Sequence, residues 1–366
     1  MNPLLIVREL GQSIWLDDIR RDWLEDGTLQ RLIDEDGLAG VTSNPAIFAK
    51  AIGAGGVYDE AIAALAEDGL PAGKIYERIV LADVQRAADM FRPTFDRAGG
   101  NDGFVSLEVS PHLADDTEGT LAEARRLWRE FDRPNAMIKV PGTKAGLPAI
   151  RTLIGEGINI NVTLLFGLER YGEVVDAWMS GLEERLARGQ GIDGISSVAS
   201  FFLSRIDTLV DPKLDAMGSE DAKALRSRAA IASARLAYEM YRKWEASERW
   251  KKLAARGGRV QRLLWASTST KDPKLPDTYY VEALIAPQTV NTLPRATIDA
   301  YRDHGQPAVR IGEDLEGARR TVEGLKRLGI DLRTVSEQLE REGVKKFIEP
   351  FDALHASLAK RIAQGR

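Results

Sequence analysis

One lysine lies inside an apolar segment that has the length of a buried strand. The segment reads AMIKVPG over residues 136–142, and Lys139 is its only charged residue. Burying an unpaired ammonium group is costly, so such an amine tends to lose its proton. A neutral lysine attacks carbonyl carbons and can form a Schiff base. Taken alone, the segment fits better with a lysine at a strand edge whose stem reaches water, so the neighbouring polar residues must decide.

Polar residues gather where other apolar segments end. Each of them alone fits a turn or a helix cap. Together, one amine, two carboxylates and several amides and hydroxyls at one edge indicate a Schiff-base site. The carboxylates would serve acid–base steps, and the amides would orient substrate hydroxyls. The residues are Asp17, Thr42, Ser43, Asn44, Ser106, Glu108, Asn159, Asn161, Thr163, Ser197, Ser200 and the run 267–271.

Eight short apolar runs alternate with longer amphipathic stretches. This alternation is typical of a parallel sheet covered by helices, and eight strands predict a closed (β/α)8 TIM barrel. A doubly wound sheet would need a glycine-rich turn after its first strand, but residues 16–19 read LDDI. The expected strands are 13–16, 39–42, 104–109, 136–140, 158–164, 195–201, 262–266 and 279–285.

We expect a single barrel domain over residues 1–366. The Ala- and Arg-rich stretch at about 207–258 predicts a helical insertion on the barrel flank. The region at about 330–366 predicts a C-terminal helical extension.

Composition excludes several classes of protein. The chain of 366 residues has no cysteine and only three histidines, which do not have the spacing of metal ligands, so no metal site is predicted. A formal net charge of −5 argues against nucleic-acid binding. An anionic substrate would therefore need a local cluster of cations. Without a signal-peptide layout or an apolar run of about 18 residues, a cytoplasmic protein with no membrane contact is expected.

Three motifs resemble one enzyme family. They are GVTSNP at 40–45, MIKVPGT at 137–143 and INVTLLF at 160–166. In this order and spacing they resemble the transaldolase family over essentially the whole chain. The run WASTSTK at 265–271 and the long C-terminal region are similar to the longer bacterial branch, which includes transaldolases fused to a glucose-6-phosphate isomerase.

The resemblance implies a class I aldolase barrel that needs no metal or organic cofactor. It implies transfer of a dihydroxyacetone unit from a ketose phosphate to an aldose phosphate in the non-oxidative pentose phosphate pathway. The donors would be fructose 6-phosphate or sedoheptulose 7-phosphate, and the acceptors erythrose 4-phosphate or glyceraldehyde 3-phosphate. Family members include dimers, so a monomer or a homodimer is expected.

The resemblance also implies four catalytic residues. Lys139 would be the Schiff-base nucleophile, and Asp17 would take the proton of the C4 hydroxyl. Glu108 and Thr163 would position a water molecule for proton transfers during Schiff-base formation and hydrolysis.

Substrate contacts follow from the same resemblance. Asn44, Asn161 and Ser200 would hold the dihydroxyacetone fragment. Phe202 would line the site, and the guanidinium of Arg205 would bind a phosphate bidentately.

The loop after the seventh strand departs from the family pattern. The commoner transaldolases have a second phosphate-binding arginine there, whereas residues 267–271 read STSTK. Hydroxyls, backbone N–H groups and a lysine can also bind phosphate, so Ser267, Ser269 and Lys271 are candidates. For Lys271, a solvated loop lysine remains the alternative.

Two other functions stay open. A fructose-6-phosphate aldolase of the same superfamily would release dihydroxyacetone to water. The pattern of such aldolases has Gln and Tyr at the positions where this chain has Glu108 and Phe202, so the resemblance favours the transferase. The second alternative is a non-catalytic barrel that serves as a scaffold. The joint presence of the lysine, the carboxylates and the amides argues against it.

Overall fold

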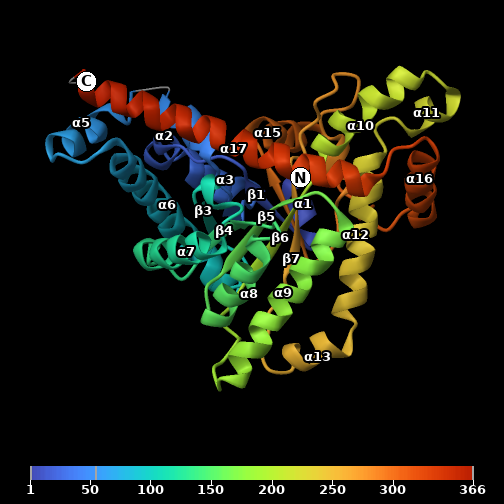
Figure 1. Cartoon of the computed structure of the whole chain (residues 1–366), viewed down its shortest axis with the longest axis horizontal. Helices are drawn as coiled ribbons and strands as arrows, with labels where there is room; N and C mark the ends of the chain where they lie inside the picture. Colours follow the sequence, from blue (N-terminus) through green and yellow to red (C-terminus); the bar gives the residue numbers. More distant parts are fainter. Residues whose placement is uncertain (1, 54–55, 365–366) are drawn as a thin grey trace.

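The chain forms a closed barrel of parallel strands surrounded by helices (Figure 1), which confirms the predicted (β/α)8 class. The computed structural model describes residues 2–53 and 56–364. Each strand pairs with the next one along the chain, and the last strand pairs with the first. The strands are β1 (Gln12–Leu16), β2 (Gly40–Val41), β3 (Phe104–Glu108), β4 (Ala136–Pro141), β5 (Ile160–Leu165), β6 (Ser197–Phe202), β7 (Arg262–Ala266) and β8 (Thr289–Leu293).

The eighth strand lies elsewhere than the sequence predicted. Residues 279–285 were expected to form it, but Tyr279–Ala283 is the short helix α14, and β8 is Thr289–Leu293. Aromatic and β-branched residues favour strands in general. Here Tyr280 is buried and donates a hydrogen bond to Asp207 at 2.8 Å. These tertiary contacts outweigh the preference of the segment for a strand.

Helices before β6 alternate with the strands and cover the barrel. A single turn of 3-10 helix, η1 (Pro111–Leu113), follows β3. The helices are α1 (Pro3–Glu9), α2 (Arg21–Glu25), α3 (Thr28–Asp36), α4 (Pro45–Gly53), α5 (Asp59–Glu67), α6 (Ala72–Arg97), α7 (Thr117–Phe131), α8 (Gly146–Glu156) and α9 (Leu168–Ala187).

Helices after β6 include several that a minimal barrel does not need. Four of them separate β6 from β7, in the region predicted as an insertion. The helices are α10 (Ser204–Met217), α11 (Glu220–Leu225), α12 (Ala229–Glu245), α13 (Glu248–Ala254), α14, α15 (Arg295–His304), α16 (Leu315–Arg327) and α17 (Leu332–Ala363). The assignment of residues 1–366 to one domain remains a proposal.

The last helix, α17, lies across one end of the barrel (Figure 1). It contacts β5, η1, α4 and α10, so it joins segments from both halves of the chain. Gly343 allows its close approach, because a Cβ atom at this position would lie 3.0 Å from Leu164 Cδ2. His112 of η1 bonds Asp352 of α17 at 2.7 Å. The helix is thereby fixed over the strand ends.

The strands are buried and largely apolar, as parallel strands covered by helices require, but they also carry buried polar residues such as Lys139 and Asn161. Gly40 in β2 faces the ring of Trp15, and a Cβ atom there would come within 2.7 Å of that ring. The described part of the chain contains no helix that combines the length and the hydropathy needed to cross a membrane.

Candidate active site

Three neighbouring strands bring a carboxylate, an amine and an amide side by side. Glu108 of β3 is in register with Lys139 of β4, and Lys139 is in register with Asn161 of β5. Residues in register on neighbouring parallel strands point to the same side of the sheet. The sequence motifs therefore converge because the strands pair in chain order.

Lys139 is buried, with 3% of the residue exposed. Its Nζ lies 3.2 Å from Glu108 Oε2 and donates a hydrogen bond to the carbonyl oxygen of Ser43 at 3.1 Å. The ring of Phe347 lies over the amine at 5.5 Å. Burial raises the pKa of Glu108 to about 7, although the Lys139 ammonium opposes this shift. The Glu108 carboxyl group therefore changes its protonation state near neutral pH, directly beside the Lys139 amine.

Asp17 follows β1 and supplies a second carboxylate. Thr42 donates its hydroxyl hydrogen to Asp17 Oδ1 at 2.8 Å, and Thr42 Oγ1 lies 2.7 Å from Thr292 Oγ1. Burial raises the pKa of Asp17, while Lys139 and the bond from Thr42 lower it. A carboxyl group held in this way can accept or return a proton more readily than one at the surface.

Amide and hydroxyl groups extend the site along β5 and β6. Asn161 Nδ2 donates to Ser106 Oγ at 3.0 Å, and Ser200 Oγ donates to Asn161 Oδ1 at 2.7 Å. These bonds fix the orientation of the Asn161 amide. Asn44 Oδ1 accepts from the N–H of Ile47 at 3.1 Å, at the start of α4.

Thr163 is fully buried on β5, two residues beyond Asn161. Its Oγ1 has no hydrogen-bond partner among the described residues. The two carboxylate oxygens of Glu108 also make no hydrogen bond there, although one of them forms the ion pair with Lys139. Buried polar atoms are generally paired with protein or with ordered water. A local irregularity follows Thr163, because the register with β6 shifts after Val162 and Leu164 has φ +61°.

Cations line the outer part of the site. Arg205 stands at the start of α10, and its guanidinium lies 5.3 Å from the Phe202 ring. Burial lowers the pKa of Arg205 and also that of Lys271, whose charged ammonium form is further destabilised by the positive charge of Arg205. Lys271 Nζ donates to Ser269 Oγ at 2.8 Å. Ser267 has φ +56°, a left-handed conformation that is strained for a non-glycine residue and recurs at functional sites.

A cavity of about 590 Å³ joins these groups at the carboxyl ends of the strands. This volume lies within the range of small-molecule sites, about 300–1,000 Å³. Nine of the predicted site residues line it: Asp17, Asn44, Lys139, Ser200, Phe202, Arg205, Ser267, Ser269 and Lys271. The other three, Glu108, Asn161 and Thr163, belong to the buried layer beside Lys139.

Two lining residues come from α17 and were not predicted. Lys346 and Phe347 reach the cavity from the helix that crosses the barrel end. Lys346 is exposed, and its amine approaches Glu342 no closer than 4.0 Å. In the sequence it cannot be distinguished from a surface lysine such as Lys345 beside it.

Two polar residues grouped with the site serve the opposite end of the barrel. Asn159 donates to the carbonyl oxygen of Ala136 at 3.0 Å and accepts from the N–H of Ser196 at 2.8 Å. Ser197 donates to the carbonyl oxygen of Ile160 at 2.8 Å. These partners lie where β4, β5 and β6 begin, so the expectation that the two residues join the site was wrong.

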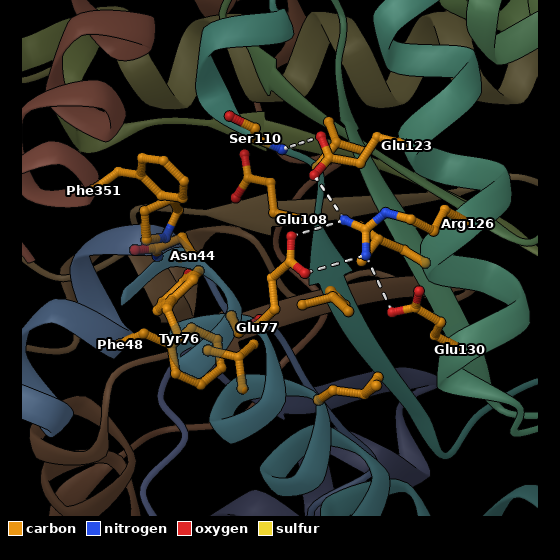
Figure 2. Close-up of a pocket in the computed structure, with 18 of the residues that line it drawn as sticks. Asn44, Phe48, Tyr76, Glu77, Glu108, Ser110, Glu123, Arg126, Glu130 and Phe351 are labelled. Carbon is orange, nitrogen blue, oxygen red and sulfur yellow. Dashed lines mark hydrogen bonds and ion pairs between the residues drawn. The ribbon is translucent and has the colours of Figure 1, made fainter. Parts of the chain in front are cut away.

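A second, smaller cavity lies behind Glu108. Figure 2 shows it, with Glu108 near the ion network in which Arg126 pairs with Glu77 at 3.0 Å. Its volume is about 100 Å³, room for a few water molecules but not for a sugar phosphate. The larger cavity is therefore the candidate substrate site.

Among residues 2–53 and 56–364, no three His, Cys, Asp or Glu side chains are grouped so that they could hold a metal ion.

The sequence matches known proteins over almost its full length. The profile of the family described as "Transaldolase/Fructose-6-phosphate aldolase" matches residues 14–358. A transaldolase of Parafrankia sp. is 50% identical over 361 residues, 98% of either chain. A transaldolase of Frankia alni is 49% identical over 364 residues, 99% of this chain and 98% of that protein. "Transaldolase 2" of Nostoc sp. is 48% identical over 373 residues, with 99% and 98% coverage.

Proposed function

Because this chain belongs to the transaldolase/fructose-6-phosphate aldolase family, we propose that it is a transaldolase acting through a Schiff base on Lys139. It would transfer a dihydroxyacetone unit from fructose 6-phosphate or sedoheptulose 7-phosphate to glyceraldehyde 3-phosphate or erythrose 4-phosphate. These reactions belong to the non-oxidative pentose phosphate pathway. The buried Lys139–Glu108 pair at the base of a cavity of suitable size is the observation that carries the proposal.

The first step joins Lys139 to the donor. The neutral amine bonds to C2 of the ketose, the carbonyl oxygen takes up one proton from the amine and a second from solvent and leaves as water, and a protonated imine remains. Glu108 would accept the proton of the attacking amine and supply it to the departing hydroxyl. Its distance of 3.2 Å from Nζ and its pKa of about 7 support this role.

Cleavage then breaks the bond between C3 and C4. Asp17 would take the proton of the C4 hydroxyl, C4 becomes the aldehyde carbon of the departing aldose phosphate, and the bonding electrons form an enamine on Lys139. The acceptor aldehyde reverses these changes and recovers the proton from Asp17. The raised pKa of Asp17 and its bond from Thr42 support this assignment.

Water must be held for the hydrolysis of the final imine. Thr163 Oγ1 and the carboxylate oxygens of Glu108 make no hydrogen bond among the described residues, and Glu108 has only its ion pair with Lys139, which supports a shared water molecule as the link between Glu108 and Thr163. Asn44, Asn161 and Ser200 would hold the hydroxyls of the three-carbon fragment. The bond from Ser200 to Asn161 supports a fixed amide orientation.

The phosphate group would bind at the cationic rim. Arg205 stands in the first turn of α10, where a helix favours an anion, and one of its nitrogens is buried without a partner among the described residues. Ser267, Ser269 and Lys271 would supply hydroxyls and a charge on the other side. We add Lys346 of α17, since it lines the same cavity.

Product analysis separates a transaldolase from an aldolase. With fructose 6-phosphate alone, we expect almost no free dihydroxyacetone. Adding erythrose 4-phosphate should produce sedoheptulose 7-phosphate and glyceraldehyde 3-phosphate in equal amounts. Continuous release of dihydroxyacetone without an acceptor would instead establish the aldolase reaction.

A further inference from the structure

Two arginines share an unusual feature. Among the described residues, only Arg205 and Arg235 have a buried guanidinium nitrogen without a hydrogen-bond partner. A buried unpaired donor is costly, and an arginine in this state lacks the anion that its planar fork is shaped to bind. Arg205 lies in the candidate active site, whereas Arg235 lies on α12, outside the barrel.

Arg235 borders a cavity of about 510 Å³ formed by α12, α14 and α16. The helices α12 and α16 pack beside each other at one flank of the molecule (Figure 1). Arg228 and Arg320 line the same cavity, together with Asp314 and Tyr279. None of the residues that line this cavity lines the substrate cavity at the strand ends.

The charges in this cavity do not balance. Asp314 caps α16, where its Oδ1 accepts the N–H of Gly317 at 2.9 Å, and it pairs with Arg320 at 3.4 Å. Arg228 and Arg235 have no carboxylate partner within residues 2–53 and 56–364. Two positive charges therefore face the cavity unpaired, in a chain whose net charge is −5.

We propose that this cavity is a second anion-binding site and that it takes a phosphate monoester. A phosphate monoester carries nearly two negative charges at neutral pH, which matches the two unpaired arginines. Guanidinium groups bind phosphate oxygens through paired, charge-assisted hydrogen bonds. The volume exceeds that of a phosphate ion and leaves room for the organic part of a small phosphorylated metabolite. This site does not depend on the proposed transaldolase reaction.

Calorimetric titration tests the site in an Arg205→Met variant. This substitution removes the arginine that would bind phosphate in the substrate cavity. The probes are inorganic phosphate and glycerol 3-phosphate, which has no carbonyl group to react with a lysine. We expect saturable binding that Arg228→Gln or Arg235→Lys weakens roughly tenfold. Tighter binding of glycerol 3-phosphate than of phosphate would identify an organic monoester as the ligand class. Equal dissociation constants would identify the phosphate group alone.

Arg129→Gln is the matched control, since Arg129 is an exposed helix arginine on α7 that does not line this cavity. It should leave binding unchanged. Arg228 is also exposed, so Arg228→Gln should fold normally and retain the turnover of the unmodified chain. The proposal is overturned if the Arg205→Met protein shows no saturable binding, or if Arg228→Gln and Arg235→Lys bind like Arg129→Gln.

Discussion

Lys139 and Glu108 form an ion pair from which almost all water is excluded, with 4% and 3% of their side chains exposed. The desolvation cost of such a pair commonly offsets its Coulomb attraction, so stability gives little reason to keep it. The pair does, however, place a proton acceptor against a nucleophile. Catalysis therefore explains this buried pair better than stability does.

Replacing Glu108 by Gln should remove a pH-dependent step. In the native chain the pKa of Glu108 is raised to about 7, so the carboxylate that accepts a proton forms as pH rises through 7. We expect kcat/KM to rise over this interval in the unmodified chain. In Glu108→Gln it should be lower by roughly 10²- to 10³-fold and lack this limb. Initial rates between pH 5 and about 9 measure the difference.

Glu77→Gln provides the control for that profile. Glu77 borders the rear cavity with Glu108 but pairs with Arg126 rather than with Lys139. Its replacement should leave the limb near pH 7 in place. A limb that persists in Glu108→Gln would assign it to a different group.

Replacing Lys346 by Gln should weaken substrate binding more than catalysis. We expect KM for the sugar phosphate to rise roughly fivefold with kcat nearly unchanged, because an exposed charge contributes about 1 kcal/mol at most. The effect should shrink at high salt. Lys345→Gln, one residue away and outside the cavity, should leave KM unaltered. An equal rise of KM in both variants would show that the substrate responds to the total positive charge of the helix and not to Lys346 itself.

At the scale of elements, the strands that carry the motifs were predictable and the cover of the barrel was not. Seven strands lie where apolar runs end in polar residues. A parallel strand that is buried on both faces must consist mainly of apolar residues, so such strands are visible in the sequence. The eighth, Thr289–Leu293, has three polar residues among five, so its sequence is less typical of a buried strand than the run Tyr279-Tyr280-Val281. Lys346 and Phe347 reach the site only through the packing of α17, for which the sequence offers no local signal.

Gly343→Val tests the position of α17. The added atoms would press on Leu164 and Phe166, because a Cβ atom at Gly343 would lie 3.0 Å from the first side chain and 3.5 Å from the second. Overpacking of this kind costs about 1–3 kcal/mol of the free energy of unfolding, measurable by urea denaturation. Displacement of Lys346 and Phe347 should also raise KM. Lys345→Val adds a β-branched residue on the exposed face and should change KM little; a similar rise in both variants would refute the role of Gly343.

At the scale of the whole molecule, positive charges cluster in two cavities although the chain as a whole is negatively charged. The chain carries a net charge of −5, yet Arg205, Lys271 and Lys346 face one cavity, and Arg228 and Arg235 face another. The first group was partly predictable from motifs that resemble a known family. The second was not, because Arg228 and Arg235 come from an ordinary helical stretch and meet Arg320 only in the folded chain.

Borohydride trapping tests the central claim most directly. The chain is incubated with fructose 6-phosphate, reduced, digested and examined by peptide mass spectrometry. A three-carbon adduct on Lys139 is expected, and prior addition of erythrose 4-phosphate should diminish it because the acceptor consumes the enamine. An active preparation that yields no adduct, or an adduct on a different lysine, would contradict the assignment of Lys139 as the nucleophile.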